Sequence, residues 1–143
     1  TTGPATVARA VLDVNATSAM IVPTGTTAQR PASAVAGMVR YNTDEGGRLE
    51  TYNGAAWGGI ISGGIGIDPP NIPVNSGTTV TFAFTGATVG SVVAISPSSA
   101  LPNGIIIAWA RVSAANTIQV RFENNAGAAV NPPSIGYNIR VIQ

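Results

Sequence analysis

Residues 104–124 read GIIIAWARVSAANTIQVRFEN, and this stretch decides the fold class. In its second half, Ile118, Val120 and Phe122 alternate with more polar residues, as in a β-strand with one buried face. The first half, IIIAWA, is apolar at every position, so both of its faces can be buried. We therefore expect a central strand there, with Trp109 in the core.

Similar short runs flank this stretch. Residues 78–84, 91–96 and 136–142 are also predicted to be strands, separated by turns rich in Gly, Pro and Asn. No segment keeps a helical period, because Gly or Pro interrupts nearly every window of helical length. The chain is therefore expected to be all-β. Its residues 72–143 are predicted to form a small antiparallel β-sandwich or jelly-roll-like domain.

The N-terminal part has a different pattern. Residues 1–57 are predicted to be an extended arm followed by a β-hairpin, together an attachment and trimerisation module. The hairpin reads MVRYNTDEGGRLETYNGAAW over residues 38–57. Residues 58–71 are rich in Gly and then Pro, and we expect them to be a linker at the domain boundary.

The chain is unusually poor in charge. Of its 143 residues, 9% are charged, against roughly 25% in typical soluble domains. All seven basic residues are Arg. We expect part of the surface to be shared with other subunits and the rest to be coated with Ser, Thr, Asn and Gly. The net charge of +1 gives no electrostatic case for nucleic acid or an anionic membrane as a partner.

The catalytic inventory is small. The sequence has no His and no Cys, which removes the common nucleophile–base pairs and most zinc sites. Asp44 and Glu45 are neighbours in a turn, where they are expected to serve as turn residues rather than as a catalytic pair. We predict a protein that is not an enzyme, with no cofactor and no metal site.

Four charged residues surround the hairpin, and an antiparallel hairpin can fix its register by placing opposite charges face to face. Arg40 and Glu50 are the expected pair. Arginine also suits dry contacts with the carbonyls and carboxylates of adjacent chains. Trp57 is predicted to anchor the hairpin to a neighbouring subunit, with a sugar-stacking platform as the alternative. The candidate subunit-interface residues are Arg30, Arg40, Tyr41, Arg48, Tyr52 and Trp57.

Three segments in this part resemble a module that recurs in tailed-bacteriophage fibre and virion proteins. They are PTGTTAQRP at Pro23–Pro31, GMVRYN at Gly37–Asn42 and LETYNGAAW at Leu49–Trp57. The stretch Leu101–Asn125 looks like the terminal β-domain of phage and prophage fibre-like proteins. The resemblance implies an intertwined homotrimer with a structural role in the particle, and it brings no catalytic motif.

These observations predict a homotrimeric virion structural protein at the surface of a phage particle. It would be a short tail fibre, a head fibre or a capsid decoration protein, with other capsid or tail proteins as partners. The alternative is a receptor-binding fibre tip for host surface glycan, which would use the polar loops at 96–104 and 124–134. A polysaccharide hydrolase is the weakest of the three hypotheses.

Overall fold

The computed structural model describes residues 18–44 and 47–143, and within these ranges the chain is built from β-strands. One short 3₁₀ helix, η1 (Thr27–Gln29), lies near the start. The strands form two sheets, so the expected all-β class is confirmed. Residues 1–17 of the predicted N-terminal arm lie outside the described residues.

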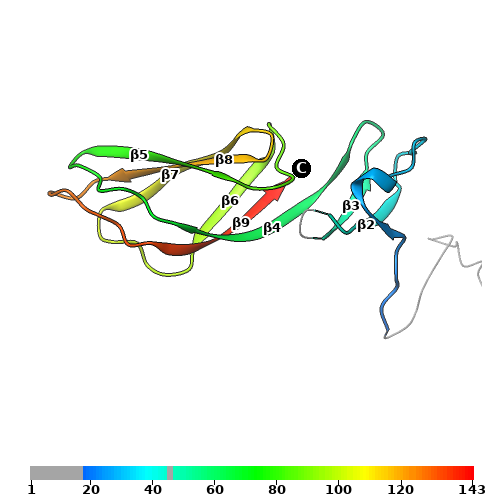
Figure 1. Cartoon of the computed structure of the whole chain (residues 1–143), viewed down its shortest axis with the longest axis horizontal. Helices are drawn as coiled ribbons and strands as arrows, with labels where there is room; N and C mark the ends of the chain where they lie inside the picture. The colour runs from blue at the N-terminus through cyan, green and yellow to red at the C-terminus, as the bar shows by residue number, and fades with distance from the viewer. Residues whose placement is uncertain (1–17, 45–46) are drawn as a thin grey trace, which may run out of the picture.

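The larger sheet has six strands and the smaller one has three. In spatial order the larger sheet contains β1 (Thr24–Gly25), β2 (Val39–Asn42), β3 (Arg48–Tyr52), β4 (Trp57–Ile67), β9 (Ile135–Ile142) and β6 (Val92–Pro97). The smaller sheet contains β5 (Ser76–Ala83), β8 (Thr117–Asn124) and β7 (Ile105–Ala114). Strands β1 and β2 are parallel, and the other pairs are antiparallel. Figure 1 shows the short strands at one end, the two facing sheets at the other, and β4 running through both.

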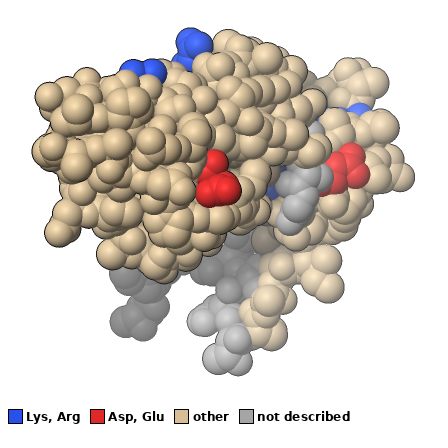
Figure 2. Space-filling model, turned by 60° about the vertical axis from the view of Figure 1, so that its left-hand side comes forward, with Lys and Arg blue, Asp and Glu red and all other residues tan. Residues whose placement is uncertain are grey.

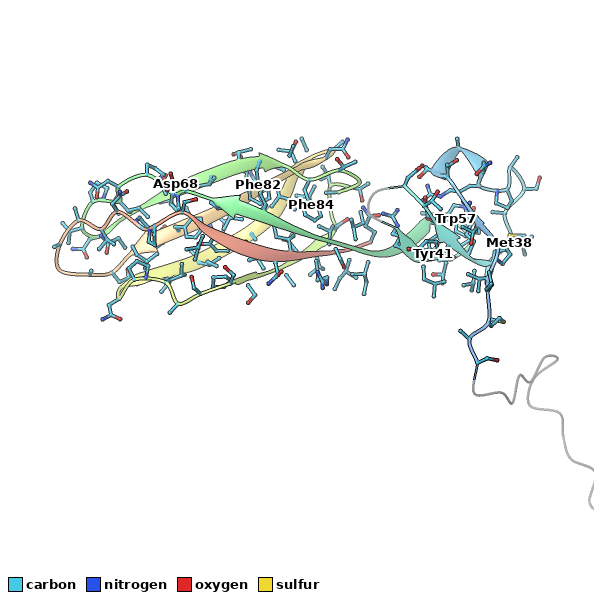
Figure 3. All side chains as sticks on the ribbon, turned by 60° about the horizontal axis from the view of Figure 1, so that its bottom comes forward. Met38, Tyr41, Trp57, Asp68, Phe82 and Phe84 are labelled. Atoms are coloured by element: carbon cyan, nitrogen blue, oxygen red, sulfur yellow. The ribbon has the colours of Figure 1, made fainter. Side chains whose placement is uncertain are left out.

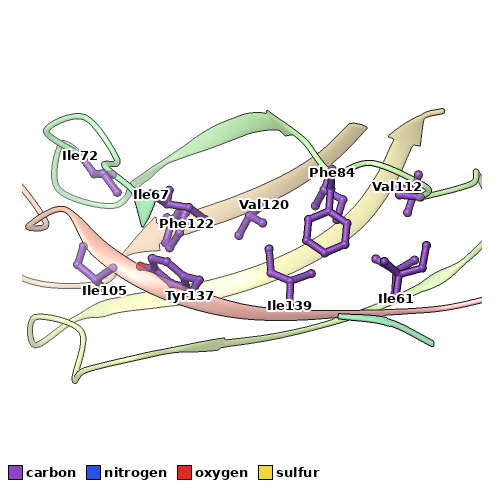
Figure 4. Close-up of a cluster of buried hydrophobic side chains, with 13 residues drawn as sticks. Ile61, Ile67, Ile72, Phe84, Ile105, Val112, Val120, Phe122, Tyr137 and Ile139 are labelled. Carbon is purple, nitrogen blue, oxygen red and sulfur yellow. The ribbon is translucent and has the colours of Figure 1, made fainter. Parts of the chain in front are cut away.

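The five strands predicted for the C-terminal part are confirmed as β5 to β9. Their apolar faces meet in one core between the two sheets (Figure 4). Phe122 from β8 and Tyr137 from β9 are both buried, and their rings meet edge to face with centroids 5.9 Å apart. Fully burying an apolar side chain of this size contributes about 1.5–3 kcal/mol, so alternation in the sequence is enough to select these strands.

The predicted linker at 58–71 is wrong over most of its length, because residues 57–67 form the eleven-residue strand β4. Ile61 and Ile67 of this strand are buried in the core. The glycine at Gly63 makes room for a neighbour, since a Cβ there would lie 2.9 Å from the ring of Phe84. Gly58, Gly59 and Gly63 therefore serve close packing rather than flexibility. Strand β4 continues from the hairpin into the two-sheet body.

The prediction of a central strand at 104–112 is also wrong. Strand β7 lies at an edge of the smaller sheet, and Trp109 is 41% exposed rather than in the core. The exposure of Trp109 results from an irregularity in the β7–β8 register between Ile107 and Trp109. A β-bulge adds one residue and exchanges the faces of the residues after it. Trp109 is therefore turned outward.

Candidate functional site

The hairpin holds a buried ion cluster centred on Glu50, whose side chain is fully buried. Arg30 donates two hydrogen bonds to it, from Nε to Oε1 at 3.1 Å and from Nη2 to Oε2 at 2.5 Å. Arg40 Nη1 donates to Oε1 at 3.2 Å, and Asn42 Nδ2 donates to Oε2 at 3.1 Å. Arg48 Nη2 lies 3.9 Å from Oε2. Arg40 and Glu50 are register partners, as predicted.

This environment sets the ionisation of Glu50. Burial of the carboxyl raises its pKa, but the hydrogen bonds from Arg30 and Asn42 and the charges of Arg30 and Arg40 together outweigh burial. The net result is a pKa below the ordinary value of 4.5. Glu50 is therefore ionised at neutral pH and enclosed by its donors. Such a carboxylate stabilises the hairpin and is not placed to react with a substrate.

The segment around η1 covers the cluster. Arg40 Nη1 donates to the Thr26 carbonyl at 3.1 Å, and Asn42 Nδ2 donates to Thr27 Oγ1 at 2.9 Å. The Thr27 amide in turn donates to Asp44 Oδ2 at 2.7 Å. Gly25 is needed for this approach, because a Cβ there would lie 2.6 Å from Arg40 Nη2. The GTTAQR and RYN segments thus form one packed unit.

The cluster changes the interpretation of several candidate residues. We predicted that the hairpin arginines would bind carbonyls and carboxylates of adjacent chains. In the structure Arg30, Arg40 and Arg48 converge on Glu50 of their own chain. Sequence reasoning missed the roles of Asn42 and Asp44 in the cluster. Their partner Thr27 lies 15 to 17 residues earlier in the sequence, so the pattern of the hairpin alone does not indicate these contacts.

Tyr52 and Trp57 lie at the open end of the hairpin. They are register partners, and their rings are 5.3 Å apart between centroids. The Arg30 guanidinium carbon lies 6.0 Å from the centre of the Trp57 ring. Trp57 is half-buried and lines a groove of about 540 Å³, together with Arg30 and residues of the loop at 86–91. Met38 and Trp57, both labelled in Figure 3, line a second groove on the hairpin.

At the hairpin end, the opposite face of the six-stranded sheet is apolar and exposed. On the hairpin it presents Val39 and Tyr41 from β2 and Leu49 from β3. The same face continues onto β4, because Thr51 of β3 pairs with Gly58 of β4. Two residues after Gly58, Ile60 lies on this face. Ile60 pairs with Ile142 of β9, which pairs with Val92 of β6. We call this set the outward apolar face; its members are Val39, Tyr41, Leu49, Ile60, Val92 and Ile142, each 40–62% exposed.

Polar and apolar residues are thus reversed on the hairpin. An antiparallel sheet with one solvated face normally turns apolar residues inward and polar residues outward. Here the charged residues are enclosed and the apolar ones face outward. Figure 2 shows one side of the molecule, on which charged side chains are few and set apart.

Metal-binding clusters and membrane-spanning helices were sought among the described residues. Within 18–44 and 47–143, no three His, Cys, Asp or Glu side chains gather closely enough to hold a metal ion. The described part of the chain also contains no helix long and apolar enough to cross a membrane.

Comparisons with protein-family models, with curated protein sequences and with solved structures give no match for this chain. The geometry of the cluster and of the outward apolar face is therefore the basis for a functional proposal, beside the resemblance found in the sequence.

Proposed function

We propose that this chain is a structural protein of a tailed-bacteriophage particle, assembled as a homotrimer. It would be a short fibre or a capsid decoration protein, with the two facing sheets projecting as a β-sandwich. The observation that carries the proposal is the outward apolar face. Contiguous exposed apolar patches of more than a few hundred Å² are uncommon on monomers and are typical of association surfaces.

The outward apolar face suits a contact between identical copies. Around a rotation axis the same residues of each copy approach one another, so a charged residue near the axis would meet its own like charge. None of the six side chains in this face is charged. Arg140, on the same side of β9, marks its border. Burying this face against two further copies would also fit the depletion of charge at interface cores.

The other sheet provides a contrast. The outward residues of the three-stranded sheet include Arg111, Gln119, Arg121 and Glu123, with an ion pair of 2.7 Å between Arg121 Nε and Glu123 Oε1. This face also carries the exposed Trp109 and Ile106, but its central strand is polar on the outward side. The two sides of the molecule therefore differ, with one side suited to water and the other to cover by a partner.

The ion cluster supports the same proposal through rigidity. Glu50 and its donors lie directly behind Tyr41 and Leu49, on the other side of the same two strands. A surface held by a fixed scaffold loses less conformational entropy on association than a mobile one. Four residues of the cluster, Arg30, Arg40, Asn42 and Glu50, also belong to the segments that resemble the phage module, for which a trimer is implied.

Labelling of intact particles tests the proposal. Phage particles would be purified from a host that produces this chain and labelled with a gold-conjugated antibody against the loop at 98–104. The proposal predicts label at fixed positions on the head or tail and threefold averaging that sharpens the projecting density. Recovery of the chain only from the soluble lysate, with no label on particles, would overturn it.

A further inference from the structure

We propose that the outward face of the three-stranded sheet is a binding platform for a carboxylate-bearing polysaccharide, centred on Trp109 and Arg111. The platform consists of Trp109, Arg111, Gln119, Arg121 and Thr81. Its first support is the exposed indole, which the bulge after Ile107 turns outward. A half-exposed Trp provides a rigid apolar surface with only two side-chain torsions to fix.

The platform is already ordered. The Arg111 guanidinium carbon lies 5.7 Å from the centre of the Trp109 ring. Its Nε and Nη2 both donate to Gln119 Oε1, at 3.1 and 2.9 Å. Gln119 Nε2 then donates to Thr81 Oγ1 at 3.3 Å, so one polar chain crosses all three strands. Because these side chains hold each other in place, a ligand would bind with a reduced entropy cost.

The charge distribution identifies the ligand chemistry. The contacts of Arg111 within the described residues are an amide oxygen and an indole ring, both neutral. The second arginine of the platform, Arg121, is paired with Glu123 at 2.7 Å and is the register partner of Trp109. The face therefore has one cation that no carboxylate of the described chain neutralises. Because Gln119 Oε1 occupies the Nε and Nη2 edge of Arg111, a carboxylate would bind at the Nη1 side of the guanidinium, as a charge-assisted hydrogen bond.

A sugar acid fits both halves of the platform. The C–H face of a sugar ring is apolar and can pack against the exposed indole, while hydroxyls can bond to Gln119 and Thr81. Trp109 and Arg111 are two residues apart on one strand, about 6–7 Å along it, so one bound sugar ring can contact both. The sheet face is open along its strands, so an extended polymer can continue beyond both residues.

Calorimetric titration tests this platform, with polygalacturonate as the acidic probe and dextran as the neutral one. We expect saturable binding of polygalacturonate that weakens as salt is raised. Arg111→Gln should weaken that binding at least tenfold. Arg140→Gln removes the same charge from the outward face of the other sheet and should leave binding unchanged. In a Trp57→Phe background Trp109 is the remaining tryptophan, and polygalacturonate should quench its fluorescence.

Several results would overturn the platform. One is an equal loss of polygalacturonate affinity in Arg111→Gln and Arg140→Gln, since binding would then depend on the net charge of the chain alone. Equal affinity for dextran and polygalacturonate, or no quenching of Trp109, would also overturn it. A Trp109→Phe variant keeps an aromatic residue on β7 and checks the fold. If this variant lowers the molecular mass in solution, the face is a subunit contact and the platform is wrong.

Discussion

Replacing Glu50 by Gln tests the ion cluster most sharply. The carboxylate is fully buried between Arg30, Arg40 and Arg48, at distances of 2.5, 3.2 and 3.9 Å. The Glu50→Gln substitution keeps the size of the side chain but removes its negative charge. The buried guanidinium of Arg40 then loses its carboxylate partner. The N–H₂ group of the new side-chain amide also meets donors instead of acceptors.

The expected cost is large for a single substitution. Removing one partner from a buried ion pair typically destabilises a protein by about 3–5 kcal/mol, because the remaining charge stays buried without compensation. That is a sizeable part of the total stability of about 5–15 kcal/mol that is usual for a domain. We therefore expect the hairpin of Glu50→Gln to unfold at a lower urea concentration than the two-sheet body.

The assay is urea unfolding at a fixed protein concentration, since assembly makes stability depend on concentration. In a Trp109→Phe background Trp57 is the remaining tryptophan, and it reports on the hairpin. The effect should depend on pH in a definite direction. Because the folded pKa of Glu50 is lowered, its contribution is fully present above the ordinary pKa of 4.5 and is lost as the pH falls through the folded pKa. The parent and Glu50→Gln should therefore converge in acid.

A matched control is available on the other sheet. Glu123 forms an ion pair with Arg121, but both side chains are 32% exposed. An exposed pair contributes about 0–1 kcal/mol, so Glu123→Gln should have little effect. A loss below about 1 kcal/mol for Glu50→Gln, or equal losses for both variants, would refute the reasoning about the cluster.

Three further outcomes follow from single contacts. The Tyr137 hydroxyl is buried without a hydrogen-bond partner among the described residues, and burial raises the pKa of Tyr137. Tyr137→Phe should therefore raise the free energy of unfolding by about 1 kcal/mol. A lower thermal unfolding midpoint for this variant would contradict the prediction. The Asn124 amide donates to the carbonyls of Ile72 and Ala128, both at 2.9 Å. Asn124→Ala should therefore lower the free energy of unfolding in urea by about 2–3 kcal/mol, and an unchanged free energy would contradict this. Leu49→Arg on the outward apolar face should increase the trimer dissociation constant, measured by light scattering, at least tenfold. Val74→Arg, at a similarly exposed site away from that face, should leave this constant unchanged. Equal dissociation constants for the two variants would place the interface elsewhere.

Part of this fold could be predicted from local pattern. Strands β5, β8 and β9 alternate apolar and polar residues, and the buried set of β8, for example, is the one that alternation predicts. The pairing of Arg40 with Glu50 also follows from local sequence, because the turn between them is short and opposite charges favour that register.

The rest depends on contacts that are distant in sequence. Glycines in β4 resemble those of a linker until Phe84, more than 20 residues later, packs against Gly63. The bulge that exposes Trp109 depends on pairing with β8 and leaves no periodic signal in IIIAWA. Similarly, Arg30 donates the shortest hydrogen bond to Glu50 but is 20 residues away in the sequence. The hairpin sequence alone therefore suggests only the pair with Arg40.

The central claim is that this chain assembles with two further copies of itself through the outward apolar face. The most direct measurement is the molar mass of the purified chain by light scattering during dilution into the micromolar range. Three chains of 14.4 kDa predict a mass of about 43 kDa that persists on dilution. A stable mass of 14.4 kDa at all concentrations would contradict the account.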